Sequence, residues 1–383
     1  MFKLPRAVWL LGWVSLATDA ASEAVYSLIP FFLTSVLGAG AVSLGLIEGA
    51  AEAANSVLKV LSGRLADRTT RKRRLVLLGY SVSSAARPFM ALATGWLQVF
   101  TVRVLDRVGK GVRGAPRDAM LASWATSTNR GRVYGFHQAM DNLGAVVGPV
   151  CATLFLLAYP GRYRTLFTLT IVPGAIAVLL ILLLPERDPD DRMAPDAASG
   201  FSRSEPLPRS FRTFMIVLAI FALGNSTDAF LLLRLTQASG SPRFVPLMWA
   251  GIHVVKATTS VIGGSWSDRI GRRAVIAIGW LVYAVVYAGF AVSRGLPALI
   301  AWFLVYGFYF GFAEGTEKAL VADLAPVSRR GTAFGIFNAV TGLGALAASV
   351  LFGIVWNWFG APVAFAVGAV LALVATALLF VTV

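Results

Sequence analysis

The chain has little cysteine, histidine or charge. Cys151 is its one cysteine among 383 residues, so no disulfide can form within the chain. Charged residues make up 14% and hydrophobic residues 57% of the chain, against about 25% charged and about 45–50% apolar in soluble globular proteins. The motifs HExxH and GxSxG and an extended soluble domain are also missing. We therefore expect a lipid-embedded protein that is not an enzyme and needs no cofactor.

The charge that is present is mostly positive, with a net value of +15, but its placement argues against nucleic-acid binding. Lys and Arg lie in short breaks between apolar runs, whereas a DNA-binding protein gathers them on one water-facing domain. Under the positive-inside rule, the basic breaks and both termini lie in the cytoplasm, which predicts an integral protein of the cell membrane. The basic breaks are TRKRR (70–74), NRGR (129–132), residues 186–212, DRIGRR (268–273) and VSRRG (327–331).

Long apolar stretches predict the membrane spans. A spanning helix needs about 20 mostly apolar residues. Twelve such stretches are centred near residues 22, 50, 84, 108, 144, 172, 222, 254, 282, 309, 342 and 370. The first continues to Leu37, which predicts an uncleaved transmembrane helix and not a signal peptide. Residues 186–211 are rich in Pro, Asp and Ser and predict a cytoplasmic linker between six-helix bundles at 1–185 and 212–383.

An internal repeat supports this division into halves. At a shift of 200, RGRVYGFHQAMDNLGA (130–145) aligns with RGTAFGIFNAVTGLGA (330–345), and seven residues coincide. At a shift of 201, GRLADR (63–68) aligns with GSWSDR (264–269). Two related halves with parallel topology are typical of one class of secondary transporter. The predicted fold class is therefore an all-α membrane protein with twelve transmembrane helices in two six-helix halves.

Four motifs resemble those of the major facilitator superfamily. The family's loop motif G-x-x-x-D-R-x-G-R-[RK] is similar to two segments of the chain. These are GRLADRTTRKRRL (63–75), in which Thr70 replaces a Gly, and its repeat GSWSDRIGRR (264–273). RVLDRVGKGVRGA (103–115) is similar to the fourth-helix motif. LGAVVGPVCAT (143–153) is similar to the fifth-helix motif, with Ala152 and Thr153 in place of its final Gly pair.

The resemblance implies how such a protein would work. In that family, helices 1, 4, 7 and 10 line a central cavity, the fold works as a monomer, and the fifth-helix motif is typical of exporters that exchange substrate for protons. The resemblance also implies gating residues near the cytoplasmic ends of helices, with a partner in the eleventh helix near Arg330. The predicted gating set is Gly63, Asp67, Arg68, Arg117, Asp118, Gly148, Pro149, Gly264, Asp268 and Arg269.

Ionisable residues inside the predicted spans are the main candidates for function, because each costs about 2.5–3.5 kcal/mol to insert and therefore faces a cavity or a partner. The fourth span is the densest, with Arg103, Arg107, Lys110, Arg113 and Arg117 within an arc of about 120°. The first five spans hold seven acids (Asp19, Glu23, Glu48, Glu52, Asp106, Asp118 and Asp141) and seven bases, with Lys59 and Arg87 completing the bases. The second half holds Asp228, Arg234, His253, Lys256, Glu314, Glu317 and Lys318, with Asn225 beside them.

Some of these residues have structural interpretations. We expect Arg87 to pack against an acid of the second helix, and His137 and His253 to be satisfied polar core residues. The stretch GKGVRG (109–114) matches the dinucleotide pattern GxGxxG, but it lies inside a predicted spanning helix and not after a strand. Its glycines are expected to permit close helix packing.

The predicted mechanism is alternating access driven by protons. A carboxylate of Asp19, Glu23 or Asp106 takes a proton from outside, changes its pairing with Arg107 or Lys110, and favours release of substrate. The predicted substrate-binding and proton-coupling set is Asp19, Glu23, Glu48, Glu52, Asp106, Arg107, Lys110, Arg113, Asp141, Asn225, Asp228, Glu314 and Glu317.

Three cargoes remain open from the sequence. The fifth-helix motif and the aromatic tenth span, YGFYFGF (306–312), favour export of a drug-like organic molecule. The carboxylates and Asn225 would also suit a metal ion or a metal chelate, because carboxylate oxygens bind hard cations. The basic stripe of the fourth span would instead suit an organic anion.

Overall fold

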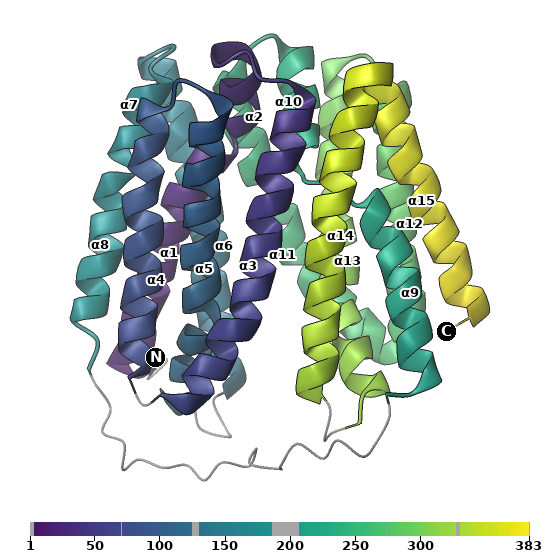
Figure 1. The fold of residues 1–383 in the computed structure, drawn as a ribbon, viewed down its shortest axis with the longest axis horizontal. Coiled ribbons are helices and arrows are strands. Elements are labelled where there is room, and N and C mark those ends of the chain that lie inside the picture. Colours follow the sequence, from purple (N-terminus) through teal and green to yellow (C-terminus); the bar gives the residue numbers. More distant parts are fainter. Residues whose placement is uncertain (1–3, 70, 125–129, 186–206, 327–329, 383) are drawn as a thin grey trace. The chain divides into compact units, whose positions relative to one another are not determined.

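The computed structural model describes residues 4–69, 71–124, 130–185, 207–326 and 330–382. All regular structure in these ranges is helical (Figure 1). The predicted linker falls mostly on residues 186–206, and the predicted boundary between the two halves therefore lies outside the described residues.

The helices of the first half follow the predicted apolar stretches. Their bounds are α1 (Arg6–Tyr26), α2 (Ile29–Phe31), a π-helical turn η1 (Phe32–Val36), α3 (Ala41–Arg68), α4 (Lys72–Ala86), a 3₁₀ turn η2 (Arg87–Leu92), α5 (Trp96–Trp124), α6 (Arg130–Ala158), α7 (Tyr163–Leu169) and α8 (Ile171–Leu182). Two predicted spans change helix type at a proline, since the ring removes a backbone N–H donor. Pro30 follows the break between α1 and α2, and Pro88 lies in η2.

The second half contains the same kind of segments. Its bounds are α9 (Arg209–Gly224), α10 (Ala229–Ser239), a 3₁₀ turn η3 (Pro242–Phe244), α11 (Val245–Ile270), α12 (Arg272–Val292), α13 (Leu296–Leu324), α14 (Arg330–Phe359) and α15 (Ala361–Thr382). The predicted seventh span is interrupted between α9 and α10, around Asn225 and Asp228.

Eight of the described helical segments are long and apolar enough to cross a membrane by length and composition. Within the described residues, the long helices α1, α3, α5 and α11 supply none of these eight segments. They are the helices that carry Asp19, Glu52, Asp106 and Lys256 among other polar residues. Each of the predicted centres nevertheless falls within one of the helical segments. Charge inside α1, α3, α5 and α11 is therefore the feature that a function must explain.

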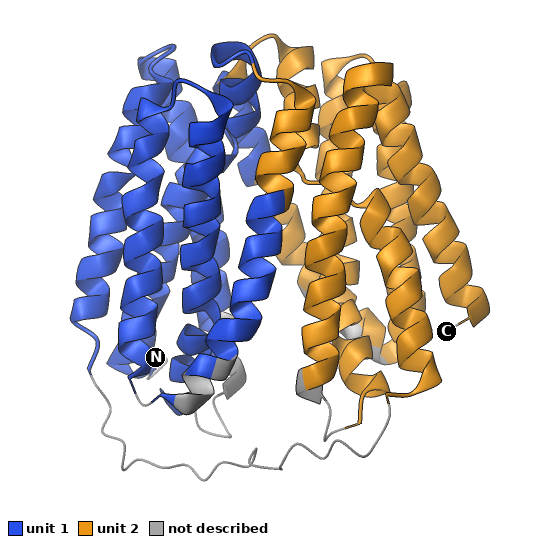
Figure 2. Ribbon diagram, in the orientation of Figure 1, with its two compact units in different colours: residues 1–38, 50–195, 243–250 blue, residues 39–49, 196–242, 251–383 orange. Residues whose placement is uncertain are grey.

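The chain forms two compact units (Figure 2). Unit 1 comprises residues 1–38, 50–195 and 243–250, and unit 2 comprises residues 39–49, 196–242 and 251–383. Helix α3 thus begins in unit 2, where Gly49 packs so closely on α14 that a Cβ atom would lie 2.9 Å from the Cα atom of Leu346. The first residues of α11 belong to unit 1. This places Trp249, far along the sequence, in the same unit as α1.

Glycines set the helix spacing in unit 1. A Cβ atom on Gly144 of α6 would lie 2.5 Å from the carbonyl oxygen of Leu16, and one on Gly148 would overlap the carbonyl of Ala20. Between α5 and α4, a Cβ atom on Gly109 would lie 2.5 Å from the carbonyl oxygen of Gly79. The absence of side chains at these positions brings α1 against α6 and α4 against α5. Gly109 and Gly111 of the fourth span thus serve packing, as predicted, whereas a Cβ atom on Gly114 would meet nothing nearer than 3.9 Å.

Candidate functional site

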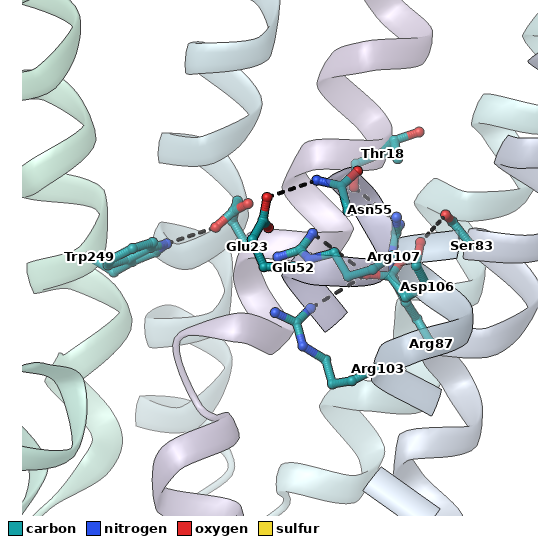
Figure 3. A network of polar contacts seen from close by, with 10 residues as sticks. All are labelled: Thr18, Glu23, Glu52, Asn55, Ser83, Arg87, Arg103, Asp106, Arg107 and Trp249. Atoms are coloured by element: carbon teal, nitrogen blue, oxygen red, sulfur yellow. Dashed lines mark hydrogen bonds and ion pairs between the residues drawn. The ribbon is translucent and has the colours of Figure 1, made fainter. Parts of the chain in front are cut away.

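A buried group of arginines around Asp106 forms the centre of the polar network in unit 1 (Figure 3). One Asp106 oxygen lies 2.9 Å from Nε of Arg87, and the other lies 3.5 Å from Nη1 of Arg103 and 3.9 Å from Nη1 of Arg107. None of these four residues is more than 9% exposed. Three guanidinium groups thus share one carboxylate in the interior, and such pairing is what permits charges to be buried.

The sequence predicts that Arg87 packs against an acid of the second helix, but it pairs with Asp106 of α5. Its Nη1 also donates a hydrogen bond of 3.1 Å to the carbonyl of Thr18. The reason is the glycine contact between α4 and α5, together with a hydrogen bond of 2.8 Å from Ser83 to the Asp106 carbonyl. This close packing places η2 directly beside α5.

Other groups of the basic stripe on α5 pack against an aromatic ring or lack a hydrogen-bond partner. Arg113 is buried, and its guanidinium lies 4.1 Å from the centre of the Tyr80 ring. Nη1 of Arg107 and Nη1 of Arg113 are buried without a hydrogen-bond partner among the described residues. Lys110 is only partly buried. Buried donors without a hydrogen bond call for a partner, and Nη1 of Arg107 has only its 3.9 Å ion-pair contact with Asp106. This side of α5 therefore offers hydrogen-bond donors to an acceptor or an anion.

A second set of acids lies where α1 meets α6. The Ser15 hydroxyl donates a hydrogen bond to Asp141. Nδ1 of His137 lies 3.6 Å from the other Asp141 oxygen. This contact is longer than a hydrogen bond, and Nε2 of His137 has no partner among the described residues, so the predicted satisfaction of this core histidine is only partial.

Asp19, on α1, interacts electrostatically with three groups of unit 1 besides Asp141. They are Glu23 on its own helix and Lys110 and Arg113 on α5. Ionised carboxylates that lie near one another repel, so a proton or a cation would stabilise this set.

Glu23 is bound by a residue that sequence reasoning missed. Nε1 of Trp249 donates a hydrogen bond of 2.8 Å to Glu23 (Figure 3). The ring of Trp249 lies 5.0 Å from that of Tyr26, and the guanidinium of Arg103 lies 5.0 Å from the Tyr26 ring. In the sequence, Trp249 is an aromatic residue in an apolar run, which is the same pattern as a lipid-facing tryptophan. No local signal distinguishes the two.

The two glutamates of α3, Glu48 and Glu52, lie in different units. Glu52, in unit 1, accepts a hydrogen bond of 3.1 Å from Nδ2 of Asn55. Asn55 in turn lies against Gly111 of α5. Glu48 is buried and belongs to unit 2, and Lys59 is exposed. Glu48, Glu52 and Lys59 therefore differ in their surroundings.

Unit 2 holds its polar residues around α13. Asp228 accepts a hydrogen bond of 2.7 Å from the Tyr306 hydroxyl, and Nδ2 of Asn225 donates one of 2.9 Å to the Tyr309 oxygen. Glu317 is buried and accepts a hydrogen bond of 2.8 Å from Nε1 of Trp280. Glu314, in contrast, is exposed. The interruption between α9 and α10 thus places Asn225 and Asp228 beside tyrosines of the predicted aromatic tenth span.

The predicted gating residues are only partly described. The backbones of Asp67, Arg68, Gly264 and Asp268 lie in α3 and α11, and their side chains lie outside the described part of the structure. Arg117 pairs with its neighbour Asp118 at 3.0 Å.

Two predicted gating glycines of the first half, Gly63 and Gly148, differ in how closely they pack against a neighbouring helix. A Cβ atom on Gly63 would be 3.6 Å from that of Ala115, which is an ordinary van der Waals contact. A Cβ atom on Gly148 would instead overlap the backbone of Ala20, and Pro149 is buried beside it in α6. Arg269 is exposed.

No group of three or more His, Cys, Asp or Glu side chains that could hold a metal ion occurs among the described residues.

The family model of the Major Facilitator Superfamily matches residues 10–255 and residues 213–383 of the chain. The chain belongs to this superfamily. An uncharacterized MFS-type transporter of Methanocaldococcus jannaschii is 32% identical over 383 residues, covering 98% of this chain and 95% of that protein. Multidrug resistance protein MdtH of Cronobacter sakazakii is 26% identical over 324 residues, covering 81% and 77% of the two chains. The cis,cis-muconate transport protein of Acinetobacter baylyi is 22% identical over 369 residues, covering 91% and 87%.

Solved structures share the superfamily fold. A POT family transporter in complex with 5-aminolevulinic acid has a TM-score of 0.82 at 12% identity, over 100% of this chain and 96% of that one. The nucleoside transporter NupG (D323A mutant) has a TM-score of 0.79 at 14% identity, over 98% and 99%. The predicted all-α membrane fold of the major facilitator superfamily is confirmed, and this member is a transporter and not an enzyme.

Proposed function

We propose that this transporter is a proton-coupled exporter of small, drug-like organic molecules that works by alternating access. The observation that carries the proposal is the carboxylate set of Asp19, Glu23 and Asp141, which lies in the electrostatic range of Lys110 and Arg113 inside membrane helices. A relative that is named a multidrug resistance protein supports the choice of cargo. Export as a monomer from the cytoplasmic membrane, exchanging a proton for the cargo, follows from the same proposal.

In this mechanism Asp19 and Glu23 are the proton-binding acids. Asp106 suits that role less well, because three arginines hold its charge in place. Protonation of Asp19 would weaken its attraction to Lys110 and relieve its repulsion from Asp141. The contact of α1 with α6, which depends on Gly144 and Gly148, would pass this change to the helices of unit 1.

Proteoliposomes loaded with the dye Hoechst 33342 provide the test. Dye transport is expected to accelerate when a pH gradient is imposed, and this acceleration is expected to disappear in Asp19→Asn and in Glu23→Gln. Asp323→Asn is the matched control, because Asp323 is exposed and pairs with Arg272 outside these sites. A rate of dye transport that changes neither with the pH gradient nor with the two substitutions would contradict proton coupling.

A second cargo, an organic anion, is favoured by a separate observation. Nη1 of Arg107 and Nη1 of Arg113 are buried without hydrogen-bond partners among the described residues. A carboxylate on the cargo would accept from these donors. The relative named for cis,cis-muconate transport supports this alternative. Uptake of labelled muconate into the same vesicles, abolished by Arg113→Gln, would select the anion over the dye.

A further inference from the structure

A small cavity lies within unit 2, among α9, α13 and α14. Its volume is about 50 Å³, and one water molecule needs roughly 10–15 Å³ of such space, so it has room for a group of a few heavy atoms. Of the described residues that line it, Glu317 alone is charged. The lining residues are Leu218, Phe221, Ala222, Asn225, Tyr309, Glu317, Thr341 and Ala345.

Glu317 has a neutral partner where a buried carboxylate would ordinarily have a cation. It accepts the indole N–H of Trp280 at 2.8 Å, and no salt bridge to it is found within the described ranges. The lysines Lys256 and Lys318 are engaged elsewhere, since they lie 3.7 and 3.4 Å from the oxygens of Glu314. A buried charge without a counter-charge is costly, so Glu317 requires a proton or a cation.

The cavity around Glu317 matches an ammonium group. The ring of Phe221 lies 5.7 Å from that of Tyr309 and stacks on Trp280 at 4.3 Å, and aromatic faces attract cations. Thr341 donates its hydroxyl hydrogen to the carbonyl of Phe337 at 3.0 Å, which leaves its oxygen to accept a hydrogen bond. Hydrogen-bond acceptors and aromatic side chains thus line the cavity together with the carboxylate.

The other charged and titratable groups near Glu317 come mostly from its own helix. Glu314 repels and Lys318 attracts the negative charge of Glu317, and Tyr309 lines the same cavity. From α12 the facing group is the indole of Trp280, and from the end of α9 it is the amide of Asn225. Among these groups, Glu317 is the one placed to exchange its proton for a bound cation.

We infer that this cavity is a subsite for the protonated amine of the cargo, and that a proton and the ammonium group compete for Glu317. The inference rests on the proposed export of organic molecules and names their class, which is primary or secondary amines. Their N–H groups would donate to Glu317 and to the oxygens of Tyr309 and Thr341. A quaternary ammonium has no N–H to donate, and an alcohol has no charge.

Calorimetric titration of the purified full-length protein tests this with three ligands that share one aromatic body. These ligands are 2-phenylethylammonium, trimethyl(2-phenylethyl)ammonium and 2-phenylethanol. The primary amine is expected to bind about tenfold or more tightly than the other two, since a hydrogen bond to a charged group is worth that factor. Lowering the pH is expected to weaken amine binding and to leave alcohol binding unchanged. Equal binding of the primary and quaternary ammonium ions would overturn the hydrogen-bonded site.

The variant Glu317→Gln keeps an acceptor for Trp280 and removes the charge. It is expected to lose about tenfold or more of the amine affinity and none of the alcohol affinity. Thr341→Val is nearly isosteric and is expected to lose about fivefold, which keeps the test decisive if Glu317→Gln does not fold. Asp323→Asn, an exposed site on the same helix, is the control and is expected to bind like the unmodified protein. Amine binding that is unchanged in Glu317→Gln, or in Thr341→Val if that variant alone folds, would overturn the subsite.

The two proposals fail separately. Proton-coupled dye transport together with amine binding that is unchanged in Glu317→Gln would overturn the subsite alone. Amine binding that requires Glu317, together with dye transport that ignores the proton gradient, would overturn the proposed coupling and leave the subsite standing.

Discussion

At the scale of single residues, two buried carboxylates of the same chemical type have opposite surroundings. Asp106 lies within 2.9–3.9 Å of three arginines, whereas Glu317 accepts a hydrogen bond from a neutral indole. A carboxylate with three cationic partners is fixed as an anion by its surroundings. One with a neutral partner is free to exchange a proton or a cation. We therefore assign Asp106 to holding unit 1 together and Glu317 to ligand binding.

Asp106→Asn should strongly destabilise the protein. The substitution leaves Arg87 and Arg103 buried without their counter-charge, and breaking a buried pair costs about 3–5 kcal/mol. Thermal unfolding in detergent should show a clear fall in Tm. Asp323→Asn, which breaks an exposed pair with Arg272, should change stability by less than about 1 kcal/mol. Equal Tm values for the two variants would refute the structural role of Asp106.

At the scale of helices, glycine contacts decide which charged residues meet. Gly144 and Gly148 bring α6 onto α1, which places Asp141 beside Ser15. Gly79 and Gly109 bring α4 onto α5, which places Arg87 beside Asp106. Small residues allow such contacts in lipid, where helices gain little from apolar burial. The fifth-helix motif that identifies the family by resemblance is therefore also a packing surface for the candidate proton site.

Alanine at two glycines of unit 1 should have effects of opposite sign. A Cβ atom at Gly148 would overlap the backbone carbonyl of Ala20, and such overpacking costs about 1–3 kcal/mol. A Cβ atom at Gly114 would meet nothing nearer than Cγ of Lys59 at 3.9 Å. Gly114→Ala should therefore raise stability by about 0.5–1 kcal/mol through helix propensity. Thermal unfolding of both variants measures this, and a Gly148→Ala protein as stable as Gly114→Ala would contradict the close contact.

At the scale of the whole molecule, the placement of positive charge predicts the orientation in the membrane. The net charge is +15, and the arginines and lysines concentrate in breaks such as TRKRR (70–74) and DRIGRR (268–273). The break TGWLQ (94–98) carries no charge. The positive-inside rule therefore predicts that the first two breaks lie in the cytoplasm and the third outside the cell.

Cysteine labelling can check this orientation with few changes, because Cys151 is the one native cysteine. In a Cys151→Ser background, Thr94→Cys should react with an impermeant maleimide on intact cells. Thr69→Cys should react only after the membrane is opened. Labelling of Thr69→Cys on intact cells would reverse the assigned orientation and place both termini outside.

The sequence by itself determined the apolar segments, the breaks between them, the repeat at a shift of 200 and the family resemblance. These features depend on hydrophobicity and local spacing, which can be read from the sequence without knowing the tertiary contacts. It also predicted that buried charge would mark the candidate site. The tertiary structure decided the partners, joining Arg87 to Asp106 and Trp249 to Glu23, which lies 226 residues away. A helix face is set by periodicity, but several neighbouring helices compete to cover it, and only their packing decides which one does.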